Sequence, residues 1–145
     1  MIDAGGGIAL STAVAAIKPL VEDKGIFEQV DLNELEMQKK VVLNLFRAIR
    51  SKFEDKWEDR TNVFLYAAGF SAALRFLQLK LIPYCNALED FTEAQIADAI
   101  DFGSAGPMSQ EALKGVGGVD AINQVFEALV ATFRQPSKKK AKVAV

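Results

Sequence analysis

The chain has 145 residues, of which half are hydrophobic and a quarter are charged, and its formal net charge is -2. This length suits one folded domain with a substantial core, and the composition excludes wholesale disorder. The chain contains no histidine and a single cysteine, Cys85. An internal disulfide, a histidine-dependent catalytic triad and a zinc site of cysteine and histidine are therefore excluded.

The charges are distributed unevenly along the chain. Segment 84–127 carries eight acids against one base, Lys114, which argues against an extended phosphate-binding surface there. The N-terminus lacks the basic and apolar pattern of a secretory signal, and no apolar stretch reaches the ~20 residues of a membrane-spanning helix. We therefore expect a cytoplasmic protein without membrane association.

Residues 1–7 end in three glycines, and we expect a flexible leader there. A helix is predicted over 8–21, which Pro19 bends or stops. Two interpretations of its start stay open. The glycine run and the first-turn hydroxyls of Ser11 and Thr12 suit an anion held by free backbone N–H groups, but the Gly-Lys-Ser/Thr ending of a phosphate loop is missing. The alternative is a mobile leader with a helix cap. The apolar contacts expected from this helix are Ile8, Leu10, Val14, Ile17, Leu20 and Val21.

Asp31 with Glu34 three residues later resembles a capping box and predicts that the next helix begins there and runs to Phe53. Its apolar residues recur at helical spacing and fall on one face. The opposite face is predicted to carry five bases, which suit contact with nucleic-acid phosphates as well as a solvated surface. The apolar face comprises Leu35, Val42, Leu45, Phe46, Ile49 and Phe53, and the bases are Lys39, Lys40, Arg47, Arg50 and Lys52.

The segment 62–82 is the longest strongly apolar stretch and predicts a central buried helix. Thr61 or Asn62 suits its N-cap, and Pro83 is expected to end it. Gly69 among alanines indicates close approach of another helix. Trp57, just before this helix, is interpreted as a packing anchor, with base stacking as the alternative. Cys85 is expected to be a core residue.

The last third of the chain predicts two further helices. Thr92 with Gln95 suits the start of a short helix that ends at Gly103. Loops and a brief helical piece then lead to the glycines at 115–118. Asp120 is expected to cap the final helix, which should dock on the central one. Its apolar face comprises Ile122, Val125, Phe126, Leu129, Val130 and Phe133.

These elements predict an all-α fold, a single-domain orthogonal bundle of about five to six helices around segment 62–82. The expected organisation is a leader at 1–7, a helical domain at 8–135 and a basic, disordered tail at 136–145. The acids at 54–55, 58–59 and 89–90 lie side by side in the sequence, and adjacent helical residues do not face each other. We therefore predict no catalytic residue, no metal site, no cofactor and no small-molecule substrate, and hence a protein that is not an enzyme.

Two segments, VVLNLFRAIRSKFEDKW and RTNVFLYAAGFSAALRFL, resemble the helical C-terminal region of DGQHR-domain proteins. The resemblance covers roughly residues 35–130, but the DGQHR pentapeptide and the α/β domain that carries it are absent. It implies a helical appendage in a DNA-modification or defence setting, such as phosphorothioation, and it transfers no catalytic residue. The matching residues are Phe46, Ile49, Phe53, Trp57, Arg60, Thr61, Gly69, Ala73 and Leu74.

Two functional hypotheses follow. The first is a non-catalytic helical module that associates with a protein partner or with further copies of itself. The second is a direct nucleic-acid binder that uses the basic face of the helix at 31–53 together with the lysines of the tail. The residues proposed for that contact are Lys39, Lys40, Arg47, Arg50, Lys52, Lys138, Lys139, Lys140 and Lys142.

Overall fold

The computed structural model describes residues 10–53, 64, 66–101 and 118–133. Within these residues the regular structure is helical, apart from one isolated antiparallel bridge between Ile100 and Phe133. The predicted all-α class is confirmed. The elements are α1 (Leu10–Val21), α2 (Ile26–Gln29), α3 (Leu35–Phe53), α4 (Ala67–Phe76), the π-helical turn η3 (Leu77–Leu81), α5 (Ile82–Leu88), α6 (Glu93–Asp98) and α7 (Gly118–Thr132).

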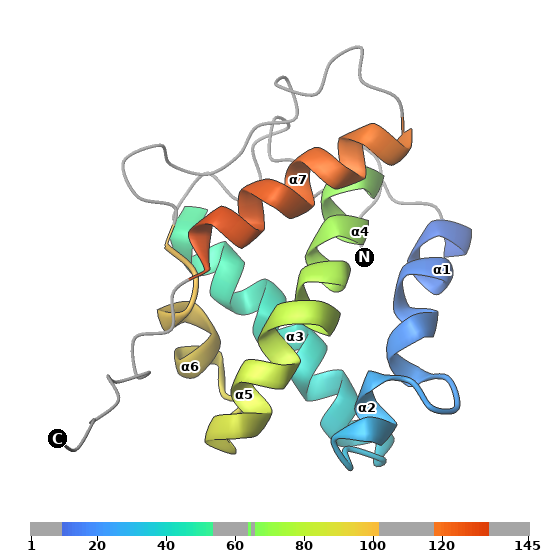
Figure 1. Ribbon diagram of the computed structural model, residues 1–145, viewed down its shortest axis with the longest axis vertical. Helices are drawn as coiled ribbons and strands as arrows, with labels where there is room; N and C mark the ends of the chain where they lie inside the picture. The colour runs from blue at the N-terminus through green and yellow to red at the C-terminus, as the bar shows by residue number, and fades with distance from the viewer. Residues whose placement is uncertain (1–9, 54–63, 65, 102–117, 134–145) are drawn as a thin grey trace, which may run out of the picture.

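A continuous rod made of α4, η3 and α5 forms the centre of the fold (Figure 1). The helix α7 lies across α4, and α1 lies beside α4 on the other side. The helix α3 runs behind the rod and packs against α6. The predicted docking of the last helix on the central one is confirmed. Buried side chains of the rod fill the core between these helices, namely Ala72, Ala73, Leu74, Phe76, Leu77, Leu81 and Ile82.

Pro83 does not end the central helix, and that prediction is wrong. In a regular α-helix a proline ring clashes with the carbonyl four residues earlier. Here the π-helical turn η3 precedes the ring, and the N–H of Ile82 donates to the carbonyl of Leu77, five residues back. This wider turn shifts the carbonyls out of α-helical register, and the helix continues to Leu88. The helix begins at Ala67, after its N-cap Tyr66, so the predicted start at position 62 is also wrong.

The predicted capping box at Asp31 is also wrong. Asp31 has a positive φ of 63°, and its N–H donates to the carbonyl of Glu28 at 3.0 Å. The N–H of Leu32 donates to the carbonyl of Phe27 at 2.8 Å. These two bonds form the Schellman pattern that closes the C-terminus of a helix. Asp31 therefore ends the four-residue α2, and α3 begins at Leu35.

The predicted start of α6 is confirmed, because the Thr92 hydroxyl accepts a hydrogen bond from the N–H of Gln95 at 3.3 Å. The helix ends at Asp98, earlier than predicted. Two contacts draw the following residues into an extended path: the bridge of Ile100 with Phe133 and the bond from the Asp101 N–H to the Thr132 carbonyl at 2.9 Å.

The final helix begins at Gly118, so Asp120 lies in its first turn and is not its cap.

Among the described helices, none combines the length and the apolar character needed to cross a membrane. Several predictions fall outside the described residues. These are the leader at 1–7, the contact of Ile8, the packing of Trp57, the caps Thr61 and Asn62, segment 103–117 and the tail at 136–145.

Candidate functional site: an apolar groove beside a basic stripe

Four of the predicted bases form a stripe along α3. At 3.6 residues per turn, Lys39, Lys40, Arg47 and Arg50 fall within an arc of roughly 100°, and all four are exposed. Lys39 Nζ lies 3.5 Å from Glu36 Oε2, in an ion pair between exposed side chains, and such a pair contributes little stability. We call these four residues the basic stripe.

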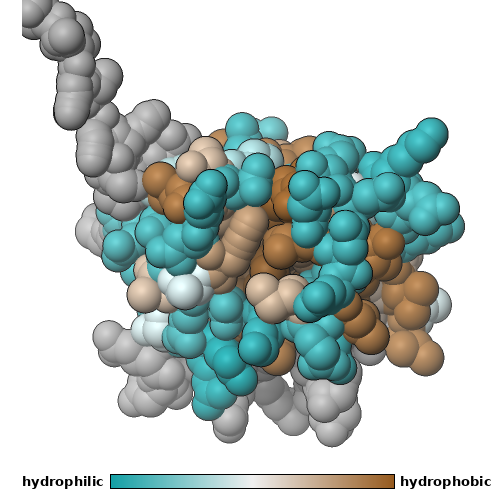
Figure 2. Space-filling view, turned by 90° about the horizontal axis from the view of Figure 1, so that it is seen from below, coloured by the Kyte–Doolittle hydropathy of each residue, from teal (hydrophilic) through white to brown (hydrophobic). Residues whose placement is uncertain are grey.

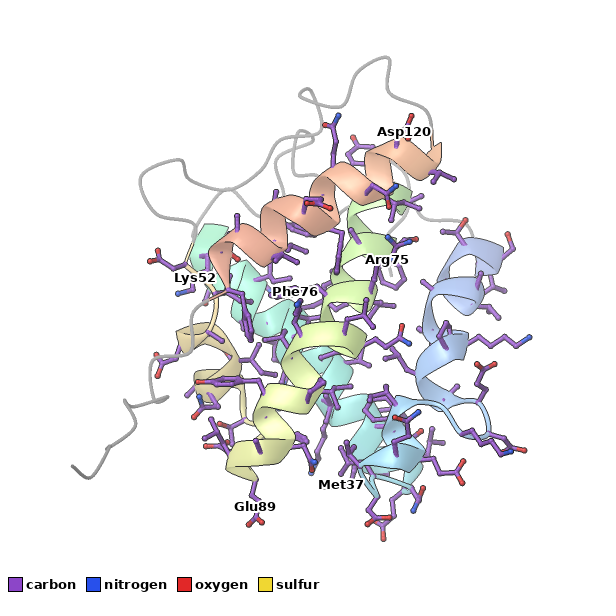
Figure 3. All side chains as sticks on the ribbon, in the orientation of Figure 1. Met37, Lys52, Arg75, Phe76, Glu89 and Asp120 are labelled. Atoms are coloured by element: carbon purple, nitrogen blue, oxygen red, sulfur yellow. The ribbon has the colours of Figure 1, made fainter. Side chains whose placement is uncertain are left out.

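Lys52 does not belong to the basic stripe, contrary to the prediction. It follows Arg50 by two residues, which turns it by about 200° to the opposite side of α3. That side carries the buried Leu45 and Ala48. Lys52 lies at the last turn of α3 and is half-buried (Figure 3). The tail lysines Lys138, Lys139, Lys140 and Lys142 lie outside the described residues.

An apolar stripe on α1 lies largely at the surface, although the sequence predicted apolar contacts for it, and of its four residues Ile17 is half-buried against the core. Leu10, Val14, Ile17 and Val21 are spaced by four, three and four residues, which sets them within an arc of roughly 60°. Leu10 is 78%, Val14 56% and Val21 45% exposed. The helix buries Leu20 instead, on the side that packs toward α4. The prediction that Leu10, Val14 and Val21 make apolar packing contacts is therefore wrong.

An open groove of about 320 Å³ separates α1 from the first half of α3. Ile17 and Val21 form its α1 wall, and the fully buried Phe27 of α2 lies at its floor. The α3 wall is formed by Leu35, Gln38, Lys39, Val42 and Leu43.

The surface of this groove is apolar, although Gln38 and Lys39 contribute to its wall. The side-chain amide of Gln38 forms a hydrogen bond within the protein, because its Nε2 donates to the Leu32 carbonyl at 2.8 Å. Leu35 was predicted to lie on the apolar face of its helix, and it is 65% exposed at the groove edge. Seen from below, apolar side chains reach the surface on the side where α1 lies in Figure 1 (Figure 2).

Lys39 is the one charged residue among those that line the groove, and it forms the ion pair with Glu36. The remaining positive charge lies on the helices outside the groove lining, and the segment 22–34 that connects them holds five acids against Lys24. The helix α3 holds five bases against one acid, Glu36, and α1 holds Lys18 and no acid. The α1 stripe and the basic stripe thus border the same apolar groove, because Lys39 lines the groove and belongs to the basic stripe. This combination sets the region apart from the acidic second half of the chain, where eight acids accompany one base over 84–127.

Cys85 is a core residue, as predicted, and is only 2% exposed. Burial, with a smaller contribution from the nearby charge of Asp90, raises the pKa of Cys85 to about 12. The thiol therefore stays protonated at neutral pH. Because the thiolate is the nucleophile, this side chain is chemically inert in the folded protein.

The described residues contain no group of three or more acidic or cysteine side chains that could hold a metal ion. In the acidic doublet at 89–90, the Asp90 carboxylate accepts bonds from the hydroxyl and the N–H of Thr92, at 2.7 and 3.0 Å. These two bonds, the hydroxyl first, lower the pKa of Asp90. The carboxylate thus supports the turn into α6.

Comparison with protein-family models, with curated proteins and with solved structures finds no match for this chain. The candidate site is therefore argued from its own geometry and charge. Sequence reasoning identified the basic stripe but missed the groove beside it. The 4-3-4 spacing on α1 was visible in the sequence, but the spacing does not show whether such a stripe meets a neighbouring helix or solvent.

Proposed function

We propose that this protein is a non-catalytic interaction module whose α1–α3 groove binds an amphipathic helix with acidic flanks from a partner protein. The observation that carries the proposal is the apolar groove with a basic stripe along one edge. Large apolar side chains exposed together around a concavity are typical of helix-in-groove recognition. The acidic character of the partner is inferred from the basic stripe of α3, of which Lys39 lines the groove.

The dimensions of the site define the partner further. The stripe on α1 spans 12 residues, which corresponds to a length of roughly 18 Å. A partner helix of about three turns would cover the whole α1 stripe, of which Ile17 and Val21 line the groove, with apolar residues at the i, i+3, i+4 and i+7 positions. Glutamates or aspartates beside that apolar ridge would face Lys39, the base that lines the groove.

A second copy of the chain is a poorer occupant than an acidic helix. Pairing the same face of two copies would bring two basic stripes together, and like charges that face each other across an interface are unfavourable. The setting in a DNA-modification or defence system is part of the proposal and is supported by the DGQHR resemblance alone.

Selection of helical peptides from a random phage-displayed library tests the proposal. We expect the enriched peptides to be amphipathic and acidic, and their binding to weaken at least tenfold in Leu43→Glu. Leu79→Glu is the matched control, because Leu43 is 49% and Leu79 51% exposed, and Leu79 lies on η3, away from the groove. Enrichment of peptides without acidic residues, or equal losses in both variants, would contradict the proposal.

Direct nucleic-acid binding is the alternative function, and the exposure of four bases within one arc of α3 favours it. Filter binding of duplex DNA over a salt series tests it, since each phosphate contact adds about 0.9 to the slope of log K against log salt. Reversing both charges in Arg47→Glu/Arg50→Glu should flatten that slope if the basic stripe contacts phosphates. An unchanged slope would eliminate this function for the stripe.

A further inference from the structure

A second concavity lies between α1 and α4, with Ile122 of α7 at its edge, and it is separate from the groove. Its volume is about 390 Å³, within the range of sites for small molecules. Four polar residues line it: Ser11 and Thr12 of α1, Ser71 of α4 and Gln78 of η3. Ala15, Ala16 and Pro19 supply an apolar part of the wall.

Arg75 gives this pocket its charge. Its Nη1 donates to Asn123 Oδ1 at 2.9 Å, and its Cζ lies 5.4 Å from the centroid of the Phe126 ring. Both contacts come from α7, and they hold the guanidinium on the side of α4 that faces α1 (Figure 3). Neither contact neutralises the positive charge, because one partner is an amide and the other an aromatic ring.

The guanidinium retains the capacity to bind an anion. Within the described residues, no carboxylate forms an ion pair with Arg75. A guanidinium has five N–H donors, and the bond to Asn123 uses one of them. Arginine held rigidly by a hydrogen bond and an aromatic face is well suited to bidentate recognition of a carboxylate or a phosphate.

We propose that this pocket binds a small organic anion, with its carboxylate or phosphate group on Arg75. The hydroxyls of Ser71 and Thr12 would donate to the same anionic group, and Ala16 and Pro19 would contact the apolar part of the ligand. The sequence had suggested an anion near the glycine run and the hydroxyls of Ser11 and Thr12. The pocket brings those two hydroxyl residues beside an arginine that is distant in the sequence.

NMR titration of the ¹⁵N-labelled full chain tests this proposal with benzoate and phenyl phosphate, which distinguish a carboxylate from a phosphate ligand. Benzamide, which is uncharged and has a similar shape, is the control ligand. We expect saturable shifts of the Ser71 and Arg75 signals with at least one anion, and binding of benzamide at least tenfold weaker. The absence of saturable shifts with both anions, or equal affinity for benzamide, would overturn the proposal.

Two substitutions test the role of the charge. Arg75→Gln should weaken binding of the anion by at least about tenfold, because hydrogen bonds to charged groups are the strong ones. Lys80→Gln removes one positive charge from the same rod outside the pocket and should leave the affinity unchanged. If Arg75→Gln does not fold, Ser71→Ala decides the question, with a several-fold loss expected. Unchanged affinity in the folded variant would refute the assignment.

Discussion

Gly25 is the position where the smallest change should have the clearest effect on stability. It is buried in the turn between α1 and α2, and its φ of -73° is open to any residue. A Cβ added there would lie 2.7 Å from the Pro19 carbonyl oxygen, 2.8 Å from that of Glu22 and 3.0 Å from that of Leu20. All three atoms belong to the backbone, so the end of α1 must shift to accommodate a methyl group.

Overpacking of this kind costs roughly 1–3 kcal/mol. For a chain of this length, Gly25→Ala should therefore lower the melting temperature by roughly 3–9 °C. Thermal unfolding followed by circular dichroism measures this shift. Because the turn positions α1 against the groove, the variant should also bind the acidic helical peptides more weakly.

Gly118→Ala provides the matched control. It is the exposed first residue of α7, and among the described residues no atom lies within 4 Å of an added Cβ. The same chemical change should leave stability unchanged or raise it by about 0.4–1 kcal/mol, because alanine reduces the freedom of the unfolded chain. Equal melting temperatures for Gly25→Ala and the wild type would refute the argument that backbone atoms close this turn.

Three further predictions concern the rod and the turn after it. Glu89 has a positive φ of 57° at the end of α5, so Glu89→Gly should raise the free energy of unfolding by about 0.5–1 kcal/mol. A lower free energy of unfolding for Glu89→Gly in denaturant titration would contradict this. Thr92→Ala should cost about 1 kcal/mol and raise the pKa of Asp90, measured by NMR titration. Because the pKa of Asp90 is lowered in the folded state, its ionised carboxylate stabilises the fold above the unfolded-state pKa, and this stabilisation is lost as pH falls through the folded-state pKa. If the free energy of unfolding of Thr92→Ala depends on acid pH as that of the wild type does, the bonds from Thr92 do not lower the pKa of Asp90. The pKa of Cys85 is raised to about 12. Its contribution to the free energy of unfolding is therefore present below the unfolded-state pKa of the thiol and is lost as pH rises toward 12. The native thiol should react with Ellman's reagent only on unfolding, and equally fast labelling of native and denatured protein would contradict its burial.

The fold class and several individual positions were predictable because they depend on local patterns. The apolar richness of 62–82 identified the central helix, and the hydroxyl of Thr92 identified the start of α6. Cys85 was expected in or near the core because a free cysteine behaves as a small hydrophobic residue. Periodicity therefore sufficed wherever a residue's role is set by its own helix.

The errors arose where contacts distant in the sequence decide the structure. The π-helical turn before Pro83 lets the central helix continue past a residue that normally ends one. Asp31 closes a helix of four residues, which is too short for periodicity to reveal. The spacing of Leu10, Val14 and Val21 groups them on one face, but only the positions of α3 and α4 show that this face meets solvent.

The candidate sites also divide into a part set by one helix, which was predictable, and a part set by contacts between helices, which was not. The basic stripe was predicted from one helix, apart from Lys52, which a count of 3.6 residues per turn places on the other side. The groove and the Arg75 pocket each need side chains from at least two helices. The lining residues extend from Ile17 to Leu43 in the groove and from Ser11 to Ile122 in the Arg75 pocket, and no spacing rule connects such residues.

Site-specific photo-crosslinking tests the central claim, that the α1–α3 groove receives an acidic helix. A benzoylphenylalanine placed at Leu43 in the native host should crosslink to a protein segment that is amphipathic and rich in glutamate or aspartate. The same probe at Leu79, which is equally exposed, should not capture that segment. Capture of the same segment from both positions, or crosslinks from Leu43 to nucleic acid, would contradict the account.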